Sequence, residues 1–167
     1  HVSVSIDQRL WKDALLAELE RVGAETQGRV LNSIFFGGGT PSLMDPETVA
    51  ALIARARSLW PSDEEPEITL EANPTSVEAG RFRAYAAGGV NRVSLGVQAL
   101  NDEALRRLGR EHSAKEALKA VELAADIFPR YSFDLIYARP DQSPAEWAAE
   151  LAAALPRAGD HLSLYQL

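Results

Sequence analysis

The stretch Val93-Ser-Leu-Gly-Val-Gln98 decides the fold, because apolar and polar residues alternate in it without a break. In a β-strand successive side chains point to opposite faces, so the three apolar residues would share one face. Ser94, Gly96 and Gln98 would share the other. A parallel strand packed between two layers of helices normally reads as a continuous apolar run instead. The polar face therefore needs a partner other than a helix.

The same alternation recurs in Ile68-Thr-Leu-Glu-Ala-Asn73 and in Ser132-Phe-Asp-Leu-Ile-Tyr137. Stretches rich in β-branched, aromatic or leucine residues predict five strands in all. These strands are Val30–Phe36, Glu67–Ala72, Arg92–Gln98, Tyr131–Tyr137 and His161–Gln166.

Helical patterns lie between the strands. Ser113-Ala-Lys-Glu116 and Ser143-Pro-Ala-Glu146 are capping boxes, and Asp45-Pro46 is a typical helix start. Further helices are predicted from Asp7 to about Glu25 and from about Ser76 to Gly88. Alternation of strands and helices implies parallel strands joined by right-handed crossovers. The sequence thus predicts an α/β fold, and element order alone leaves open a twisted sheet or a barrel.

The composition of the polar faces favours a barrel lumen. Strand faces in water usually carry Lys, Arg and Thr, whereas these faces carry Gly, Ser and single acids. We therefore expect the strands to line a partial barrel that holds a polar ligand. A sheet with one face in water is the alternative.

The overall composition limits the function. The 167 residues suit one domain, and the formal charge of −7 argues against a protein that binds nucleic acid. No apolar run approaches the ~18 residues of a membrane span, so we expect a cytoplasmic protein without a transmembrane segment. The chain has no cysteine and therefore no thiolate for a metal or cluster. His1, His112 and His161 lack metal-ligand spacing, so no metal site is predicted.

The sharpest single feature is Phe35-Phe-Gly-Gly-Gly-Thr-Pro-Ser42, which follows a predicted strand and precedes a helix start. Glycine lets the backbone approach a ligand closely and present its N–H and C=O groups. No Gly-Lys-[Ser/Thr] follows, so the stretch is not a phosphate loop, and its glycine spacing differs from the dinucleotide fingerprint. It therefore predicts a loop that contacts a small molecule, with a flexible turn as the alternative.

Glu71, Gln98 and Asp134 lie on the polar faces near the carboxyl ends of three successive predicted strands. Ligands bind at that end in parallel strand–helix folds. Two acids there favour a cationic ligand. Arg110 lies just before a capping box and follows Gly109, which gives the backbone conformational freedom there. Its guanidinium could bind a carboxylate with two hydrogen bonds. Structural hydrogen bonding is the alternative for each acid, and a surface position is the alternative for Arg110.

Taken together, these segments resemble the radical S-adenosylmethionine core of the oxygen-independent coproporphyrinogen III oxidase family. No single motif is decisive, but six occur in the right order over nearly the whole chain. They are Phe36-Gly-Gly-Gly-Thr-Pro-Ser42, Glu71-Ala-Asn-Pro74, Gly89-Val-Asn-Arg-Val-Ser-Leu-Gly-Val-Gln98, Leu108-Gly-Arg110, Asp134-Leu-Ile-Tyr137 and His161-Leu-Ser-Leu-Tyr-Gln166.

The resemblance implies a partial six-stranded (β/α) barrel of the TIM type. In that family a CxxxCxxC loop after the first strand holds a 4Fe-4S cluster, which serves to cleave S-adenosyl-L-methionine (SAM) to a 5′-deoxyadenosyl radical. The five strands predicted here would be the second to the sixth. Residues 1–167 would then be a single radical SAM core domain, incomplete at both ends, whose first strand and cysteine loop lie before His1. The cluster would belong to the full-length parent alone.

The resemblance also implies the cofactor-binding residues, and it leaves one departure. Those that fall where the family contacts SAM are Gly38, Gly39, Thr40, Glu71, Gln98, Arg110 and Asp134. SAM carries a sulfonium, an ammonium and a carboxylate, and the acids and the arginine suit those charges. Where the family has Gly-Leu-Pro, this chain has Ala138-Arg-Pro140, which predicts a bulkier, charged rim.

The family holds two main classes. One class decarboxylates coproporphyrinogen III, and the other is a haem chaperone. Glu71-Ala-Asn-Pro74 and Leu162-Ser-Leu-Tyr-Gln166 look more like the chaperone class, so the expected partners are SAM and haem, with porphyrinogen for the alternative. Outside the family, a hydrolase or isomerase on a (β/α) barrel could use Glu71 and Asp134 as acid and base.

Overall fold

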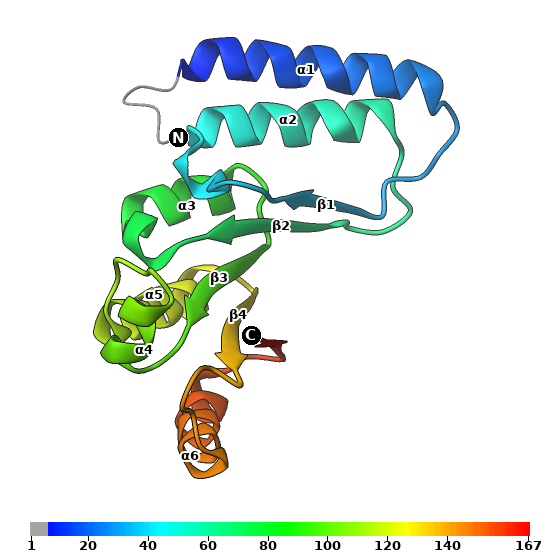
Figure 1. Ribbon diagram of the computed structural model, residues 1–167. Helices are drawn as coiled ribbons and strands as arrows, with labels where there is room; N and C mark the ends of the chain where they lie inside the picture. Colours follow the sequence, from blue (N-terminus) through cyan, green and yellow to red (C-terminus); the bar gives the residue numbers. More distant parts are fainter. Residues whose placement is uncertain (1–6) are drawn as a thin grey trace.

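The computed structural model describes residues 7–167, in which five parallel strands form one sheet in the order β1-β2-β3-β4-β5. Each strand pairs with its neighbour in sequence, so right-handed connections place the crossover helices on one face. Figure 1 shows the sheet curving away from these helices, as in part of a barrel. The predicted parallel α/β fold is confirmed. The strands are β1 Ser33–Phe36, β2 Glu67–Ala72, β3 Arg92–Gln98, β4 Arg130–Tyr137 and β5 His161–Gln166.

The helices begin close to the predicted positions. Both capping boxes are formed, with the side chains of Ser113 and Ser143 accepting from the backbone of Glu116 and Glu146. Asp45 precedes its helix as predicted, but its side chain makes no capping hydrogen bond. The α-helices are α1 Gln8–Glu25, α2 Pro46–Leu59, α3 Ala79–Ala87, α4 Asp102–Arg107, α5 Ala114–Ile127 and α6 Pro144–Ala154. Three short 3-10 helices are η1 Pro41–Leu43, η2 Pro74–Ser76 and η3 Leu155–Arg157.

The strand bounds agree with the sequence except at β1 and β4. The prediction of a strand from Val30 was wrong by three residues, because the N–H of Leu31 donates to the carbonyl of Pro61 (2.8 Å) and not to a strand. Strand β4 begins one residue earlier than predicted, at Arg130.

The core lies between the apolar face of the sheet and the helices. Val93, Leu95 and Val97 are buried there, whereas the alternate residues of β3 are partly exposed on the other face. Val49 and Ile53 bring α2 into this core, and α5 packs against β3 and β4. The period-2 pattern therefore predicted correctly which face of each central strand is packed.

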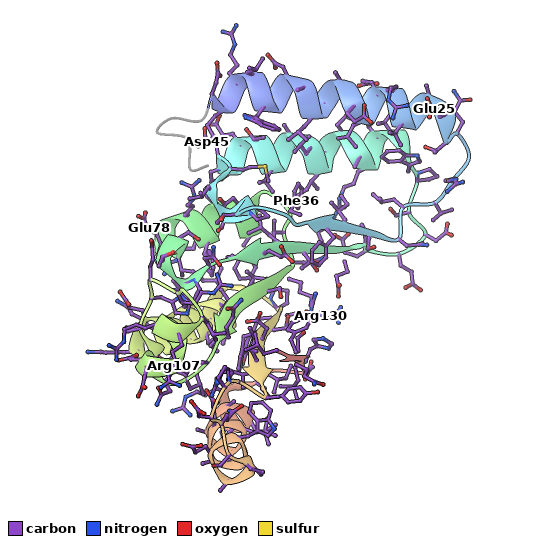
Figure 2. The ribbon with its side chains drawn as sticks, in the orientation of Figure 1. Glu25, Phe36, Asp45, Glu78, Arg107 and Arg130 are labelled. Carbon is purple, nitrogen blue, oxygen red and sulfur yellow. The ribbon has the colours of Figure 1, made fainter. Side chains whose placement is uncertain are left out.

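The amino-terminal end of the polar face carries a cation that no sequence pattern singled out. Arg92 donates to the hydroxyls of Thr69 (3.2 Å) and Ser132 (2.8 Å) and lies 3.7 Å from the carboxylate of Glu67. Glu67 also pairs with Arg130, which Figure 2 labels at the start of β4. Charged side chains thus lie at the amino-terminal end of the polar face, and the expectation of only small residues and single acids was wrong there.

Within residues 7–167 no helix is long and apolar enough to cross a membrane.

Candidate functional site

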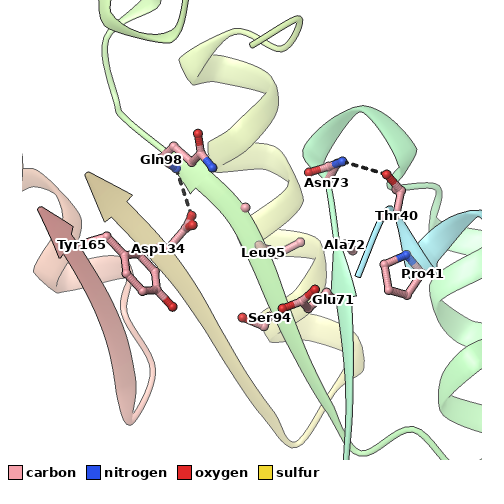
Figure 3. Close-up of a pocket in the computed structure, with 12 residues that line it drawn as sticks. Thr40, Pro41, Glu71, Ala72, Asn73, Ser94, Leu95, Gln98, Asp134 and Tyr165 are labelled. Atoms are coloured by element: carbon pink, nitrogen blue, oxygen red, sulfur yellow. Dashed lines mark hydrogen bonds between the residues drawn. The ribbon is translucent and has the colours of Figure 1, made fainter. Parts of the chain in front are cut away.

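A hollow of about 180 Å³ opens on the polar face, at the carboxyl ends of the strands (Figure 3). Five predicted site residues line it: Gly39, Thr40, Glu71, Gln98 and Asp134. The other two, Gly38 and Arg110, lie just behind, each bonded to one of these five. Further lining comes from Pro41, Ala72, Asn73, Ser94, Leu95, Gly96 and Tyr165.

The glycine loop forms one wall of the hollow. Gly38 and Gly39 have φ angles of 82° and 57°, in the left-handed region that favours glycine. A side chain at Gly37 would meet the ring of Phe35 at 2.8 Å. The N–H of Gly38 donates to the Glu71 carboxylate at 3.3 Å, so the loop already touches the acid of the next strand.

Glu71 projects from β2, in register with Ser94 of β3. Its carboxylate is partly exposed, and within residues 7–167 the long bond from Gly38 is its one hydrogen bond. Figure 3 shows its side chain beside Ser94, in the middle of the hollow. An acid with so few protein partners is free to accept further hydrogen bonds or to meet a cation.

Asp134 is held more firmly. Its carboxylate accepts from the backbone N–H of Gln98 at 3.1 Å (Figure 3). Gln98 has a φ of 66°, next to a register shift between β3 and β4, and its side-chain oxygen accepts from Nε of Arg110. Burial raises the pKa of the Asp134 carboxyl, and the N–H of Gln98 and the Arg110 guanidinium partly offset that rise. The three residues therefore form one connected unit.

Sequence reasoning missed several lining residues, although it placed them on the correct face. Asn73 donates to the Thr40 hydroxyl at 3.4 Å and links the first two strand ends. Gly96 leaves room for that amide, since a Cβ there would lie 3.2 Å from the Asn73 oxygen. Tyr165 brings an aromatic ring from β5 to the side of Asp134 (Figure 3). Their polar-face positions were the available signal, but from the strand faces only Glu71, Gln98 and Asp134 were selected.

The prediction of a charged rim at Ala138-Arg139-Pro140 was wrong. The Arg139 side chain is 11% exposed and pairs with Glu150 of α6, so its charge does not face the hollow. Glu150 also accepts from the backbone N–H of Leu100 at 2.7 Å. The departure from Gly-Leu-Pro therefore builds an ion pair behind the rim, which ties the exits of β3 and β4 to α6.

Neither of the two histidines in residues 7–167 lines the hollow. His112 is buried, with Nε2 3.1 Å from the carbonyl oxygen of Val97, and His161 is exposed at the start of β5. His1 lies outside the described residues. Across residues 7–167, no group of three His, Asp or Glu side chains is arranged to hold a metal ion.

A partial parallel barrel with a glycine loop and converging acids at its strand ends is typical of α/β proteins that bind a small molecule at that end. Residues 5–154 match the model of the radical SAM superfamily, and the chain belongs to that superfamily.

Two individual relatives and one solved structure show which members of the superfamily the chain is similar to. The chain is 44% identical over 154 residues to "Heme chaperone HemW" of Escherichia coli (strain K12), covering 92% of this chain and 41% of the relative. It is 40% identical over 168 residues to "Radical S-adenosyl methionine domain-containing protein 1, mitochondrial" of Bos taurus, covering 100% of this chain and 38% of the relative. Among solved structures, coproporphyrinogen III oxidase (HemN) from Escherichia coli superposes with a TM-score of 0.82 at 28% identity, covering 97% of this chain and 38% of that one.

These comparisons confirm the resemblance to the coproporphyrinogen oxidase-like radical SAM proteins and do not favour a hydrolase or isomerase. The chain spans about two fifths of the length of the relatives it matches. Its relatives include bacterial and mitochondrial proteins, so the cytoplasmic location stays a prediction.

Proposed function

We propose that this chain is the SAM-binding part of a HemW-like haem chaperone. The observation that carries the proposal is the convergence of Glu71, Gln98 and Asp134 on one hollow, with the glycine loop as its wall. The identity to "Heme chaperone HemW" supports the chaperone class. The proposed SAM-binding residues are Gly38, Gly39, Thr40, Glu71, Gln98, Arg110 and Asp134.

The donor set fits the charges of SAM. Glu71 offers a carboxylate with one long protein hydrogen bond, which suits the ammonium or the sulfonium. Arg110 uses Nε to reach Gln98, and within residues 7–167 no hydrogen bond involves its terminal amino groups. Those groups could donate to the SAM carboxylate. The open backbone of Gly38 and Gly39 adds further N–H and C=O groups.

The cluster does not fit this chain. Membership of the superfamily implies SAM together with a 4Fe-4S cluster, yet the sequence contains no cysteine to bind iron. The residues described here can therefore bind and orient SAM, and the cluster chemistry would need ligands from elsewhere. Haem binding likewise belongs to the proposal for the longer protein.

Calorimetric titration of SAM into the 167-residue chain tests the binding proposal. We expect one site per chain, with S-adenosylhomocysteine competing for it. Glu71→Gln should weaken binding, whereas Glu65→Gln, on the exposed loop before β2, should leave it unchanged. Heat exchange that is the same for the wild type and Glu71→Gln would refute the site.

Coproporphyrinogen oxidation is the second candidate, favoured by the TM-score of 0.82 to HemN. The two functions separate in the longer protein with a reconstituted cluster, SAM and coproporphyrinogen III. Stoichiometric haem binding without decarboxylation supports the chaperone. Multiple turnovers to protoporphyrinogen would reverse the ranking.

A further inference from the structure

The glycine loop is fastened from outside the hollow by a single arginine. Arg81, on α3, donates from Nε to the carbonyl of Ser42 (2.9 Å) and from Nη2 to the carbonyls of Leu43 (2.8 Å) and Met44 (2.7 Å). These three consecutive carbonyls lie at the end of η1, where the glycine loop stops. Figure 1 shows α3 beside this end of β1. One guanidinium therefore satisfies the backbone acceptors that end the loop.

Tyr85, one helical turn further along α3, reaches the same carbonyls. Its hydroxyl lies 2.8 Å from the oxygen of Ser42 and 2.7 Å from that of Met44, and its side chain is fully buried. The hydroxyl also accepts from Nε of Arg81 at 3.0 Å. Burial raises the pKa of the Tyr85 phenol, which keeps its proton available for donation. Arg81 and Tyr85 thus act on one short segment as a unit.

The same segment is joined to the exit of β2. The hydroxyls of Ser42 and Ser76 lie 2.6 Å apart, and Ser76 donates to the carbonyl of Asn73 at 2.8 Å. Strand β2 carries Glu71, the acid that the loop touches through Gly38. The position of η1 therefore fixes both the loop and its distance from that acid.

We propose that Arg81 and Tyr85 are positioning residues that hold the glycine loop in its ligand-binding conformation. Three consecutive glycines have little conformational preference of their own, so their order must come from what fixes the ends. Strand β1 fixes one end, and Arg81 with Tyr85 fixes the other. A loop ordered in advance binds more tightly, because less entropy is lost on binding. The inference rests on the proposed function in that SAM is the ligand used to probe it.

The experiment compares Arg81→Met and Tyr85→Phe with Arg83→Met, a control on the exposed side of the same helix. Hydrogen exchange across residues 37–44 reports loop order, and calorimetry well below the melting temperature reports SAM affinity. We expect faster exchange in both test variants, and about tenfold weaker SAM binding for Arg81→Met, a change worth ~1.4 kcal/mol. Arg81→Lys, which keeps a cationic donor, should recover part of the affinity. The control should match the wild type.

The outcomes separate the two proposals. If the wild type binds no SAM, the proposed function fails, and faster exchange confined to residues 37–44 still supports the positioning role. Unchanged exchange in both variants would overturn the positioning role. A lower melting temperature with unchanged SAM affinity among folded molecules would also overturn it, because Arg81 would then stabilise the fold without acting on the site. Tyr85→Phe keeps the buried ring, so it tests the positioning role even if Arg81→Met does not fold.

Discussion

The two halves of the rim hold their carboxylates in opposite ways. On the half formed by β1 and β2, Glu71 accepts one hydrogen bond of 3.3 Å, from a glycine N–H. On the half formed by β3 and β4, Asp134 accepts from Gln98 at 3.1 Å, and Arg110 holds the side chain of Gln98. The strand exits of this second half are tied to Glu150 of α6. The Glu71 carboxylate therefore has few protein partners, whereas the Asp134 carboxylate is held in place by its neighbours.

The backbone shows the same difference. Gly38 and Gly39 supply the positive φ angles of the first half, at no steric cost. In the second half Gln98 and Ala138 adopt positive φ angles of 66° and 57°, which cost side-chain residues free energy. Such strain persists only where the surroundings fix it. We infer that the Glu71 carboxylate of the first half can adjust to a ligand beside its fixed glycine loop, and that the second half is a preformed wall.

The largest effect is expected at the ion pair behind the second half. Arg139→Leu would leave Glu150 buried without its cation, at a cost of about 3–5 kcal/mol. The remaining donors to Glu150, from Leu100 and Gln142, place the expected loss at the lower end, or about 10 °C in the melting temperature. Arg107→Leu, in an exposed pair with Glu103, is the matched control and should cost less than about 1 kcal/mol. If thermal melts show the same loss of stability for Arg139→Leu and Arg107→Leu, the buried ion pair does not make the second half rigid.

The next effect concerns SAM affinity and tests both acids together. Glu71→Gln and Asp134→Asn should each weaken SAM binding about tenfold, or ~1.4 kcal/mol, if both carboxylates face the ligand. The melting temperature of the ligand-free chain should not fall in either variant, because Asn can still accept from the N–H of Gln98. Calorimetry measures the SAM affinity and a thermal melt of the same samples measures the stability, so the two together show whether each acid belongs to the site. If Asp134→Asn lowers the melt and leaves affinity unchanged, Asp134 is structural and only Glu71 belongs to the site.

A smaller effect is the pH dependence of stability. Burial raises the folded-state pKa of Asp134 above its unfolded value, so the folded chain binds this proton more tightly. The resulting stabilisation is fully present below the unfolded pKa, about 4, and is lost as pH rises through the folded value. Asp134→Asn lacks this titration. Its stability relative to the wild type should therefore be lowest near pH 4 and should increase toward pH 7 in urea titrations. A constant difference across that range would show that Asp134 titrates normally.

The sequence predicted the backbone of both halves of the rim, apart from the starts of β1 and β4. The sequence predicted the bounds of β2, β3 and β5 and the packed faces of β2 and β3, because a period of 2 is a local property of the chain. The three glycines indicated their loop for the same reason. Glu71, Gln98 and Asp134 converge because parallel strands end at one edge, and topology alone was enough to infer that.

What the sequence could not predict depends on partners distant in the chain. Arg139 looked like a rim charge because Glu150, its partner, comes from a helix whose position no local pattern fixes. Arg92 stands at the first residue of its strand, and its contacts with Thr69 and Ser132 depend on the pairing with β2 and β4. The role of Tyr165 depended on how far β5 curves toward Asp134. In each case the contacts of the side chain follow from tertiary structure. The period of 2 places Arg92 and Tyr165 on the polar face but leaves their partners undetermined.

The smallest prediction tests whether the second half is strained. Ala138 has a φ of 57°, where the resembling family has glycine, and a non-glycine residue there pays roughly 1–2 kcal/mol. Glycine also gains about 0.4–1 kcal/mol of unfolded-state entropy, so Ala138→Gly should stabilise the chain by only about 0.5–1 kcal/mol. That corresponds to a rise of roughly 1–4 °C in the melting temperature. Ala148→Gly, at an exposed site inside α6, is the control of opposite sign and should cost about 1 kcal/mol. If both glycines destabilise alike, the left-handed backbone at Ala138 costs nothing, and the contrast in backbone strain between the two halves is lost. If the two substitutions shift the melting temperature in opposite directions, the positive φ angle at Ala138 costs free energy. The first half avoids that cost because glycine occupies its positive-φ positions.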